Sequence, residues 1–542
     1  MGCDLKLSGG DVIDGTGEAA YRADVAIANG MISAVGDLAD LEARETLDCT
    51  GKAITPEFID IHSHGDWLVP SPTHGALFEP FIRQGMTSFV GGNCGFSPAP
   101  VTDLNRASIQ EGSRLQSDTP IELEWETMGE FLDHLEQRGI ALNVAQLVGH
   151  GVVRAAVTGA LTMDAPSDDE LSEMERLTRE ALDAGCIGIS TGLGYPPGIF
   201  AEEPELAIFA SWAAREGKLF TSHLKAYSWA SGVYKSDPSV LPHNLQAIEE
   251  IIRVAREGGA RLQISHLIFV GRETWPTYGD ALEMIERARS SGVDVSFDAF
   301  PYTAGNTTAS VLFPPEILPN LEAVLQNQEQ MAGLRAFADV VFAQLGFGLE
   351  DIQIMTANAP ELDQYDGLFV DEAAKRAGMD IWDFYGRMVV DSKRNARVLI
   401  HKYSGAPDDE EALRAVLAHP LCTVETDTML TRQGHQNPAS YGTFPRALST
   451  YVREGLFSLE EAVYRMTGAS ADRLDWTDRG WVREGCAGDL VVLDLGTLRD
   501  MATFEEPTRF PVGVDHVFIN GRHIVNGERY DSEARAGQLL RA

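Results

Sequence analysis

The residues of this chain best suited to chemistry are four histidines, one cysteine and one aspartate, each at or near the end of an apolar run. They are His62, His64, Cys94, His223, His266 and Asp427. Imidazole, thiolate and carboxylate groups are ligands that Zn2+ accepts, and a catalytic zinc site keeps one position open for water. Alternate residues of a strand face the same way, so His62 and His64 are expected to reach one metal ion. The pattern predicts a metal centre.

Each of these residues has a simpler explanation when it is considered alone. A single histidine at a strand end is more often a hydrogen-bonded core residue than a ligand, and a single buried cysteine usually behaves as a small apolar side chain. Taken together, the residues favour the metal site, because they fall at strand ends in the order that one face of a barrel would require.

The elements that must position these residues repeat along the middle of the chain. From residue 56 to about 480, strand-like apolar runs alternate with helical segments, which is typical of βα units and a parallel sheet. The expected strands are 58–64, 86–94, 142–149, 187–192, 219–224, 261–267, 293–300, 397–402 and 422–427. This is one more than an eight-stranded barrel takes, and we assign 397–402 as the extra strand because it follows the long interval 303–396. That interval predicts an inserted helical subdomain beside the site.

The two ends of the chain share a different pattern. Short alternating runs with turn signals occupy residues 4 to about 54 and return after residue 489, with the turn pairs Asn29-Gly30 and Asn520-Gly521. We therefore predict one small sheet domain built from residues 1–55 and 482–542, and a barrel domain at 56–481. The fold class is α/β.

Composition excludes several classes of partner. The chain has 542 residues, and 81 acidic against 43 basic side chains give a net charge of −38, which argues against nucleic acid and anionic membrane surfaces. No apolar run is long enough to span a membrane, so a soluble protein is expected. Six cysteines without paired spacing and the lack of a basic, apolar leader favour the cytoplasm. The oligomeric state is left open, and a homo-oligomer is compatible with the sequence.

Seven longer motifs identify a family. They are Phe58-Ile59-Asp60-Ile61-His62-Ser63-His64, Gly92-Asn93-Cys94-Gly95, Leu147-Val148-Gly149-His150, Ser190-Thr191-Gly192-Leu193-Gly194-Tyr195-Pro196-Pro197-Gly198, Ile264-Ser265-His266, Pro301-Tyr302-Thr303-Ala304-Gly305 and Tyr441-Gly442-Thr443-Phe444-Pro445-Arg446. Through them the chain resembles the amidohydrolase superfamily and, within it, the D-aminoacylase (N-acyl-D-amino-acid deacylase) group, almost from end to end.

The resemblance implies a (β/α)8 TIM-like barrel joined to a composite β-sandwich from both termini. It also implies one tightly held zinc ion on Cys94, His223 and His266, and a second, weaker metal position at His62, His64 and Cys94. Many superfamily members bridge two metals with a modified lysine on the fourth strand, but residues 187–193 contain no lysine, so a bridging Cys94 is consistent.

The resemblance further implies hydrolysis of a linear amide in a small-molecule substrate. Zinc would lower the pKa of its bound water toward ~7 and polarise the carbonyl, while Asp427 takes the proton and delivers it to the leaving nitrogen.

The chain departs from the family where an N-acyl-D-amino acid would need a basic partner for its carboxylate. The family has a lysine two residues after the histidine of the sixth strand and an arginine ahead of the Gly-Thr-Phe-Pro stretch, whereas this chain has Ile268 and Ala439. Lys225 or Arg154 could supply a replacement charge, although solvated loop charges are the more common case. The resemblance implies an N-acyl-D-amino-acid deacylase-like hydrolase, and the two replaced positions give the alternative that the same mechanism acts on a more hydrophobic or uncharged amide. Further pocket candidates are Tyr195 and His150.

Two other functions stay open. The segment 188–192 matches the Gly-x-Ser-x-Gly nucleophile elbow and would make Ser190 the nucleophile of a serine hydrolase. A true elbow continues directly into a helix, but in residues 193–198 two consecutive prolines are followed by a glycine, which makes this alternative remote. A non-catalytic barrel is the second alternative, since fold alone does not give function. It is disfavoured because all six ligand and acid positions are present.

Overall fold

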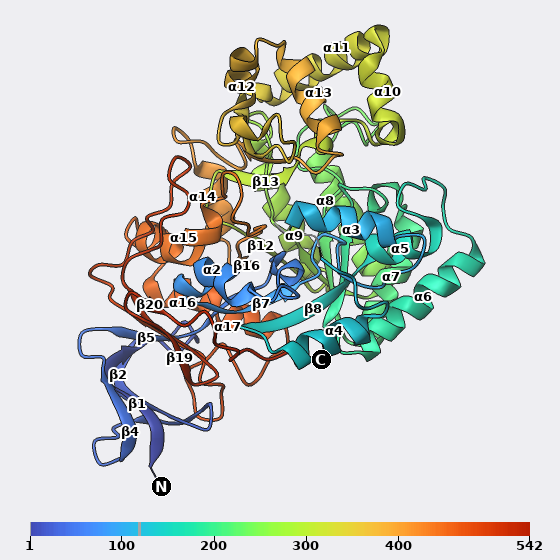
Figure 1. Ribbon diagram of the computed structural model, residues 1–542. Coiled ribbons are helices and arrows are strands. Elements are labelled where there is room, and N and C mark those ends of the chain that lie inside the picture. Colours follow the sequence, from blue (N-terminus) through green and yellow to red (C-terminus); the bar gives the residue numbers. More distant parts are fainter. Residues whose placement is uncertain (1, 117–120) are drawn as a thin grey trace.

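An eight-stranded parallel sheet forms the centre of the computed structural model, which describes residues 2–116 and 121–542 (Figure 1). Its strands are β6 (Phe58–Asp60), β7 (Met86–Gly91), β8 (Asn143–Gly149), β9 (Gly188–Gly192), β10 (Leu219–His223), β11 (Arg261–Ile264), β12 (Val295–Ala299) and β16 (Cys422–Val424). They neighbour one another in chain order from β6 to β12, and β16 follows β12. Their residues are buried almost without exception, as expected of a parallel sheet covered by helices. The predicted α/β barrel is confirmed.

Backbone hydrogen bonds just beyond the strand ends join the two edges of this sheet. The Asp427 amide donates to the His62 carbonyl at 3.0 Å, and the His64 amide donates to the Thr428 carbonyl at 3.4 Å. The barrel is therefore closed at the level of the candidate site.

Helices lie around the outside of the barrel. They are α1 (His74–Leu77), α2 (Glu79–Arg83), α3 (Arg106–Gln116), α4 (Met128–Arg138), α5 (His150–Thr158), α6 (Asp168–Asp183), α7 (Glu203–Arg215), α8 (His243–Gly258), α9 (Tyr278–Ser290), α14 (Glu411–Ala418), α15 (Ala439–Arg446), α16 (Leu459–Met466) and α17 (Gly468–Arg473). In α6, Ser167 and Glu170 form a capping box, and the buried Met174, Leu177 and Ala181 lie on one face.

The segment between β12 and β16 carries a separate subdomain, at the top of Figure 1. It contains β13 (Ala304–Thr308), β14 (Ile352–Thr356), β15 (Arg397–His401), α10 (Leu321–Gln326), α11 (Gln328–Leu345), α12 (Val370–Ala377) and α13 (Ile381–Asp391). The strand at 397–402 was assigned outside the barrel, and β15 indeed pairs with β13 and β14 in an antiparallel three-stranded sheet.

The two ends of the chain meet in one mixed sheet. Its strands are β1 (Cys3–Val12), β2 (Tyr21–Ala28), β3 (Met31–Gly36), β4 (Ala43–Asp48), β5 (Ala53–Pro56), β17 (Leu490–Leu493), β18 (Val514–Ile519), β19 (Arg522–Asn526) and β20 (Arg529–Tyr530). The antiparallel pair of β5 and β17 joins the strands from the two ends into this sheet. The division into domains at 55/56 and 481/482 stays a prediction.

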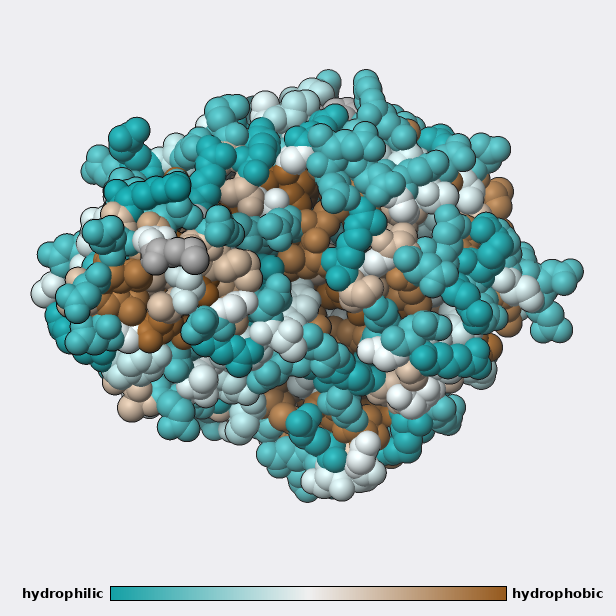
Figure 2. Space-filling view, turned by 90° about the horizontal axis from the view of Figure 1, so that it is seen from below, coloured by the Kyte–Doolittle hydropathy of each residue, from teal (hydrophilic) through white to brown (hydrophobic). Residues whose placement is uncertain are grey.

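Hydrophilic side chains predominate on one face of the molecule (Figure 2). On the face seen in Figure 2, hydrophilic side chains cover most of the area, with apolar patches between them. Among the described residues, no helix combines the length and the apolar character needed to cross a membrane.

Candidate metal centre

Two overlapping groups of side chains meet at Cys94, at the end of the barrel where the strands finish. The first is Cys94, His223 and His266, and the second is His62, His64, Cys94 and Asp427; within each group the ligand atoms lie within 4.8 Å of one another. The Cys94 Sγ atom is 3.3 Å from His62 Nε2 and 3.5 Å from His266 Nε2. All of these residues are buried. The structure thus brings together the six residues singled out in the sequence.

The expectation that His62 and His64 both lie on a strand is wrong. β6 ends at Asp60, and the ligand residues follow in a bend. Asp60 causes the turn, because its Oδ1 accepts hydrogen bonds from the backbone amides of His62 and Thr426, and its Oδ2 accepts one from the Thr426 hydroxyl at 2.6 Å. The two imidazoles still lie together, with ring centroids 5.7 Å apart.

Left-handed backbone conformations aim three of the other side chains. The φ angles are 54° at Cys94, 33° at His266 and 43° at Asp427. Residues other than glycine adopt such angles at a cost of about 1–3 kcal/mol each and are found disproportionately at functional sites. The sharp turns place these side chains just beyond β7, β11 and β16.

Asp298, on β12, holds two of the histidines. Its Oδ1 accepts a hydrogen bond from the His266 backbone amide at 2.6 Å and lies 3.3 Å from His62 Nδ1. Its Oδ2 accepts from Gln263 Nε2 at 2.7 Å. A carboxylate on one ring nitrogen of a histidine orients the other nitrogen towards a metal, and here His62 Nε2 faces Cys94.

The charges within the cluster favour a thiolate. Burial alone raises the pKa of Cys94, but the neighbouring His62, His223 and His266 outweigh it and bring the pKa well below its ordinary value. Burial alone lowers the pKa of His62, but Cys94 and Asp298 outweigh it and raise the pKa well above its ordinary value. A buried thiolate among imidazoles is a ligand set that suits zinc.

The geometry of the imidazoles fits a metal ion as well. His223 Nδ1 and His266 Nε2 face one another at 2.9 Å, and His266 Nε2 also faces the Cys94 sulfur. Nitrogen atoms and sulfur that converge in a buried space suit a cation between them.

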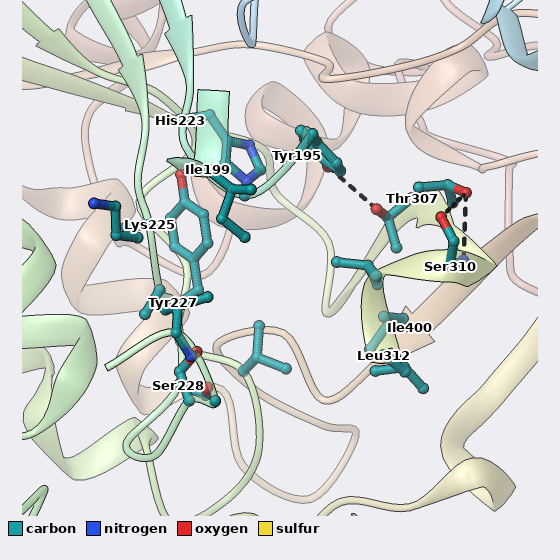
Figure 3. A pocket seen from close by; sticks show the side chains of 18 of the residues that line it. Tyr195, Ile199, His223, Lys225, Tyr227, Ser228, Thr307, Ser310, Leu312 and Ile400 are labelled. Atoms are coloured by element: carbon teal, nitrogen blue, oxygen red, sulfur yellow. Dashed lines mark hydrogen bonds between the residues drawn. The ribbon is translucent and has the colours of Figure 1, made fainter. Parts of the chain in front are cut away.

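A cavity of about 270 Å³ opens beside this cluster, lined by His64, Cys94, His223, His266 and Asp427 at one end. Its other walls come mostly from apolar side chains, among them Ile268, Leu312 and Ile400. The Tyr195 hydroxyl lies 3.2 Å from Thr307 Oγ1, and both residues line the cavity (Figure 3). Tyr195 and Ile268 therefore both line the cavity beside the cluster.

Lys225 lines the cavity, but its charge is already paired. Its Nζ atom donates to Glu250 Oε1 and to the Ala201 carbonyl, both at 3.1 Å. Figure 3 shows the amino group turned away from Thr307 and Ile400.

The structure places His150 and Arg154 outside the cavity lining. Both side chains are fully buried and contact Glu205, at 2.8 Å from His150 Nε2 and 3.1 Å from Arg154 Nε. Arg154 also donates to the carbonyls of Thr162 and Asp164. Their partner Glu205 is distant in sequence, so their role in packing α5 against α7 could not be foreseen. Ala439, at the start of α15, is likewise buried away from the lining.

Sequence reasoning missed Asp298 and Tyr227. Asp298 could have been found, because it is an acidic residue within an apolar strand. The Tyr227 ring lies 5.0 Å from the rings of both His223 and His266, and its hydroxyl accepts a hydrogen bond from the Leu224 amide. No signal in the sequence marked Tyr227, since it follows the strand in an irregular loop.

Comparison with known proteins assigns the chain to a family. A model of the amidohydrolase family (Amidohydro_3) matches residues 45–351 and 401–525. This chain belongs to the amidohydrolase family. The unmatched residues 352–400 lie within the inserted subdomain.

Relatives of this amidohydrolase match over almost its whole length. D-aminoacylase from Alcaligenes xylosoxydans xylosoxydans is 31% identical, over 99% of this chain and 97% of the relative. N-acyl-D-glutamate deacylase from the same organism is 34% identical, over 99% and 96%. A crystal structure of N-acyl-D-glutamate deacylase from Bordetella bronchiseptica, complexed with zinc and a phosphonate mimic of the tetrahedral intermediate, aligns with a TM-score of 0.83 at 30% identity, covering 100% of both chains. The predicted family is confirmed.

Proposed function

We propose that this amidohydrolase is a zinc-dependent hydrolase of linear amides. The observation that carries the proposal is the buried thiolate and imidazole cluster with Asp427 beside it at the end of a cavity. Cys94, His223 and His266 would hold one zinc ion tightly, and His62, His64 and Cys94 would offer a second, weaker position. When bound, zinc supplies Lewis acidity that polarises the amide carbonyl and lowers the pKa of water toward ~7.

Asp427 carries the proton in this proposal. Its Oδ1 atom lies 3.5 Å from His62 Nε2 and 3.7 Å from His64 Nε2, so the two imidazoles hold the carboxylate at the edge of the cavity. Asp427 accepts a proton from the attacking water and passes it to the leaving nitrogen, which departs as an amine. Tyr195 and Tyr227, whose rings flank His223, help to exclude other water from this place.

The substrate we favour is an uncharged or hydrophobic amide, and an N-acyl-D-amino acid is the second candidate. Ile268 lines the cavity where the family has lysine. Among the described residues that line the cavity, Lys225 is the only lysine or arginine, and it is paired with Glu250. A free α-carboxylate would therefore enter an apolar space without a charged partner, which is costly.

A comparison of two substrates tests this choice. N-acetyl-D-phenylalanine and its carboxamide differ only in the charge of the α-substituent. We expect the wild type to prefer the carboxamide in kcat/KM by about tenfold or more, and Ile268→Lys to shift the preference towards the acid, since a charge-assisted hydrogen bond is worth about 1.5–3 kcal/mol. Ile268→Met is the matched control and keeps the wild-type order. A strong preference of the wild type for the free acid would exclude the uncharged substrate.

The cellular compartment belongs to the same proposal. All six cysteines are buried and unpaired. This supports a reducing compartment such as the cytoplasm.

A further inference from the structure

A second cavity, of about 140 Å³, lies next to the larger one and, like it, is lined by Cys94. Its lining shares Cys94, Phe96, Tyr195 and Pro196 with the larger cavity. The rings of Phe96 and Tyr195 lie 5.3 Å apart, and both residues line both cavities. Cys94 of the candidate metal centre therefore borders both cavities.

The second cavity is apolar and lined by small residues. Gly112 on α3 and Gly151 and Ala155 on α5 contribute to it, together with Ile109 and Val152. Among the described residues that line it, none is an acid, lysine, arginine or histidine. Such a slot suits an unbranched hydrocarbon chain, because burial of each methylene removes apolar surface from water.

The position of Asp427 indicates which cavity takes which part of the substrate. A linear amide bound at the centre has two substituents, the acyl chain on carbon and the amine substituent on nitrogen, which extend in different directions. Asp427 must reach the leaving nitrogen, and it lines the larger cavity but not the smaller one. The amine substituent consequently lies in the larger cavity, and the smaller one is left for the acyl chain.

We propose that the cavity between α3 and α5 is the acyl site and that the natural substrates carry an unbranched apolar acyl chain longer than acetyl. This inference rests on the proposed amide hydrolysis, and it adds the acyl side of the substrate to it. The reaction then releases a fatty acid from the smaller cavity and an amine from the larger one.

Glycine positions allow a matched test. A Cβ atom added at Gly112 or Gly279 meets nothing within 4 Å, and one added at Gly232 meets only the Phe337 ring at 4.0 Å. Gly112 lines the smaller cavity, Gly232 lines the larger one, and Gly279 lies on α9 outside both. Replacement by leucine therefore probes the acyl site at Gly112, the amine site at Gly232 and neither site at Gly279. Ala155→Met is a second probe of the acyl site.

The experiment compares N-acetyl and N-octanoyl derivatives of one amine on the zinc-loaded protein. We expect kcat/KM of the wild type to rise by about tenfold or more from acetyl to octanoyl, given about 0.8 kcal/mol for each buried methylene. Gly112→Leu and Ala155→Met should lose most of this gain, which is read as a fall in the octanoyl-to-acetyl ratio of kcat/KM. Gly279→Leu should retain the gain. Gly232→Leu should also retain it, but should lower turnover of an amide with a bulky aniline substituent relative to an amide of a small amine.

Two results would overturn the acyl site. One is an octanoyl gain that survives both Gly112→Leu and Ala155→Met, and the other is a gain that is lost in Gly232→Leu instead. A zinc-loaded protein that hydrolyses neither derivative would contradict the proposed amide hydrolysis itself. In that case calorimetric titration still decides about the cavity, because octanoate should bind the wild type more tightly than acetate does, and Gly112→Leu should abolish the difference. Equal binding of the two acids by the wild type contradicts the site.

Discussion

Asp298 shows how a residue outside the ligand set determines the geometry of the centre. It accepts hydrogen bonds from the His266 amide and from Gln263 and lies against His62 Nδ1, so groups at the ends of two strands, β11 and β6, depend on one carboxylate. A carboxylate behind a metal-binding histidine typically raises metal affinity.

Replacement of this carboxylate tests its role. Asp298→Asn keeps the shape but offers one acceptor oxygen instead of two, so we expect zinc affinity to fall by about 10–100-fold, measured by competition with a chromophoric chelator. Asp294→Asn is the control, because Asp294 precedes β12 at the far end of the strand and pairs with Arg261 and Arg473. Unchanged zinc affinity in Asp298→Asn would show that the residue does not support the centre.

At the scale of elements, the inserted sheet carries a partly buried histidine whose neutral form is favoured. His401 ends β15, its Nε2 lies 3.2 Å from Gln353 Oε1, and the rings of Phe369 and Phe504 pack against it at 5.0 and 4.9 Å. Burial lowers the pKa of His401 to about 4. Folded His401 therefore resists protonation.

This shift makes stability depend on pH in a definite direction. The unfolded side chain takes up a proton near pH ~6.5, whereas the folded one does so near its lowered pKa, so the unfolded state binds more protons in between. The free energy of unfolding should fall from pH 7 to pH 5, by up to about 1.4 kcal/mol per unit for one histidine. We expect denaturant titrations to show a smaller loss in His401→Gln than in the wild type, and equal losses would contradict the assignment.

Repeated sequence patterns allowed the main elements to be predicted, whereas strand ends and long-range contacts were predicted less well. The alternation of strands and helices located all eight barrel strands, and the long interval before residue 397 correctly placed that strand outside the barrel. The strand ends were placed too late, because Ile61 continues the apolar pattern although the Asp60 side chain has already turned the backbone. The ligand candidates were correctly grouped because their residue types are those that bind metals. His150 was wrongly predicted to line the pocket. It pairs instead with Glu205, and the spacing of residues in the sequence does not reveal this contact.

At the scale of the whole molecule, a buried charged group joins the terminal sheet to the barrel. Arg479 Nη1 pairs with Asp489 Oδ2 at 3.0 Å, and both side chains are almost completely buried. The same oxygen accepts from Asn143 on β8, and Asp489 Oδ1 accepts from the Asn520 amide. The group therefore links segments that are hundreds of residues apart.

Removal of the positive charge should weaken this junction strongly. Arg479→Met leaves Asp489 buried without its partner, and we expect the free energy of unfolding to fall by about 3–5 kcal/mol. Arg522→Met, which removes the exposed pair with Asp531, should cost less than about 1 kcal/mol. Urea denaturation measures both, and similar losses in the two variants would show that the buried pair does not stabilise the junction.

The most direct test of amide hydrolysis at this centre is kcat for an uncharged N-acyl amide, measured on the zinc-loaded Asp427→Asn protein relative to the zinc-loaded wild type. With Asp427 as general acid and base, kcat should fall by about 10²–10⁴-fold while one zinc ion per chain is retained on Cys94, His223 and His266. A kcat close to that of the wild type would contradict the account.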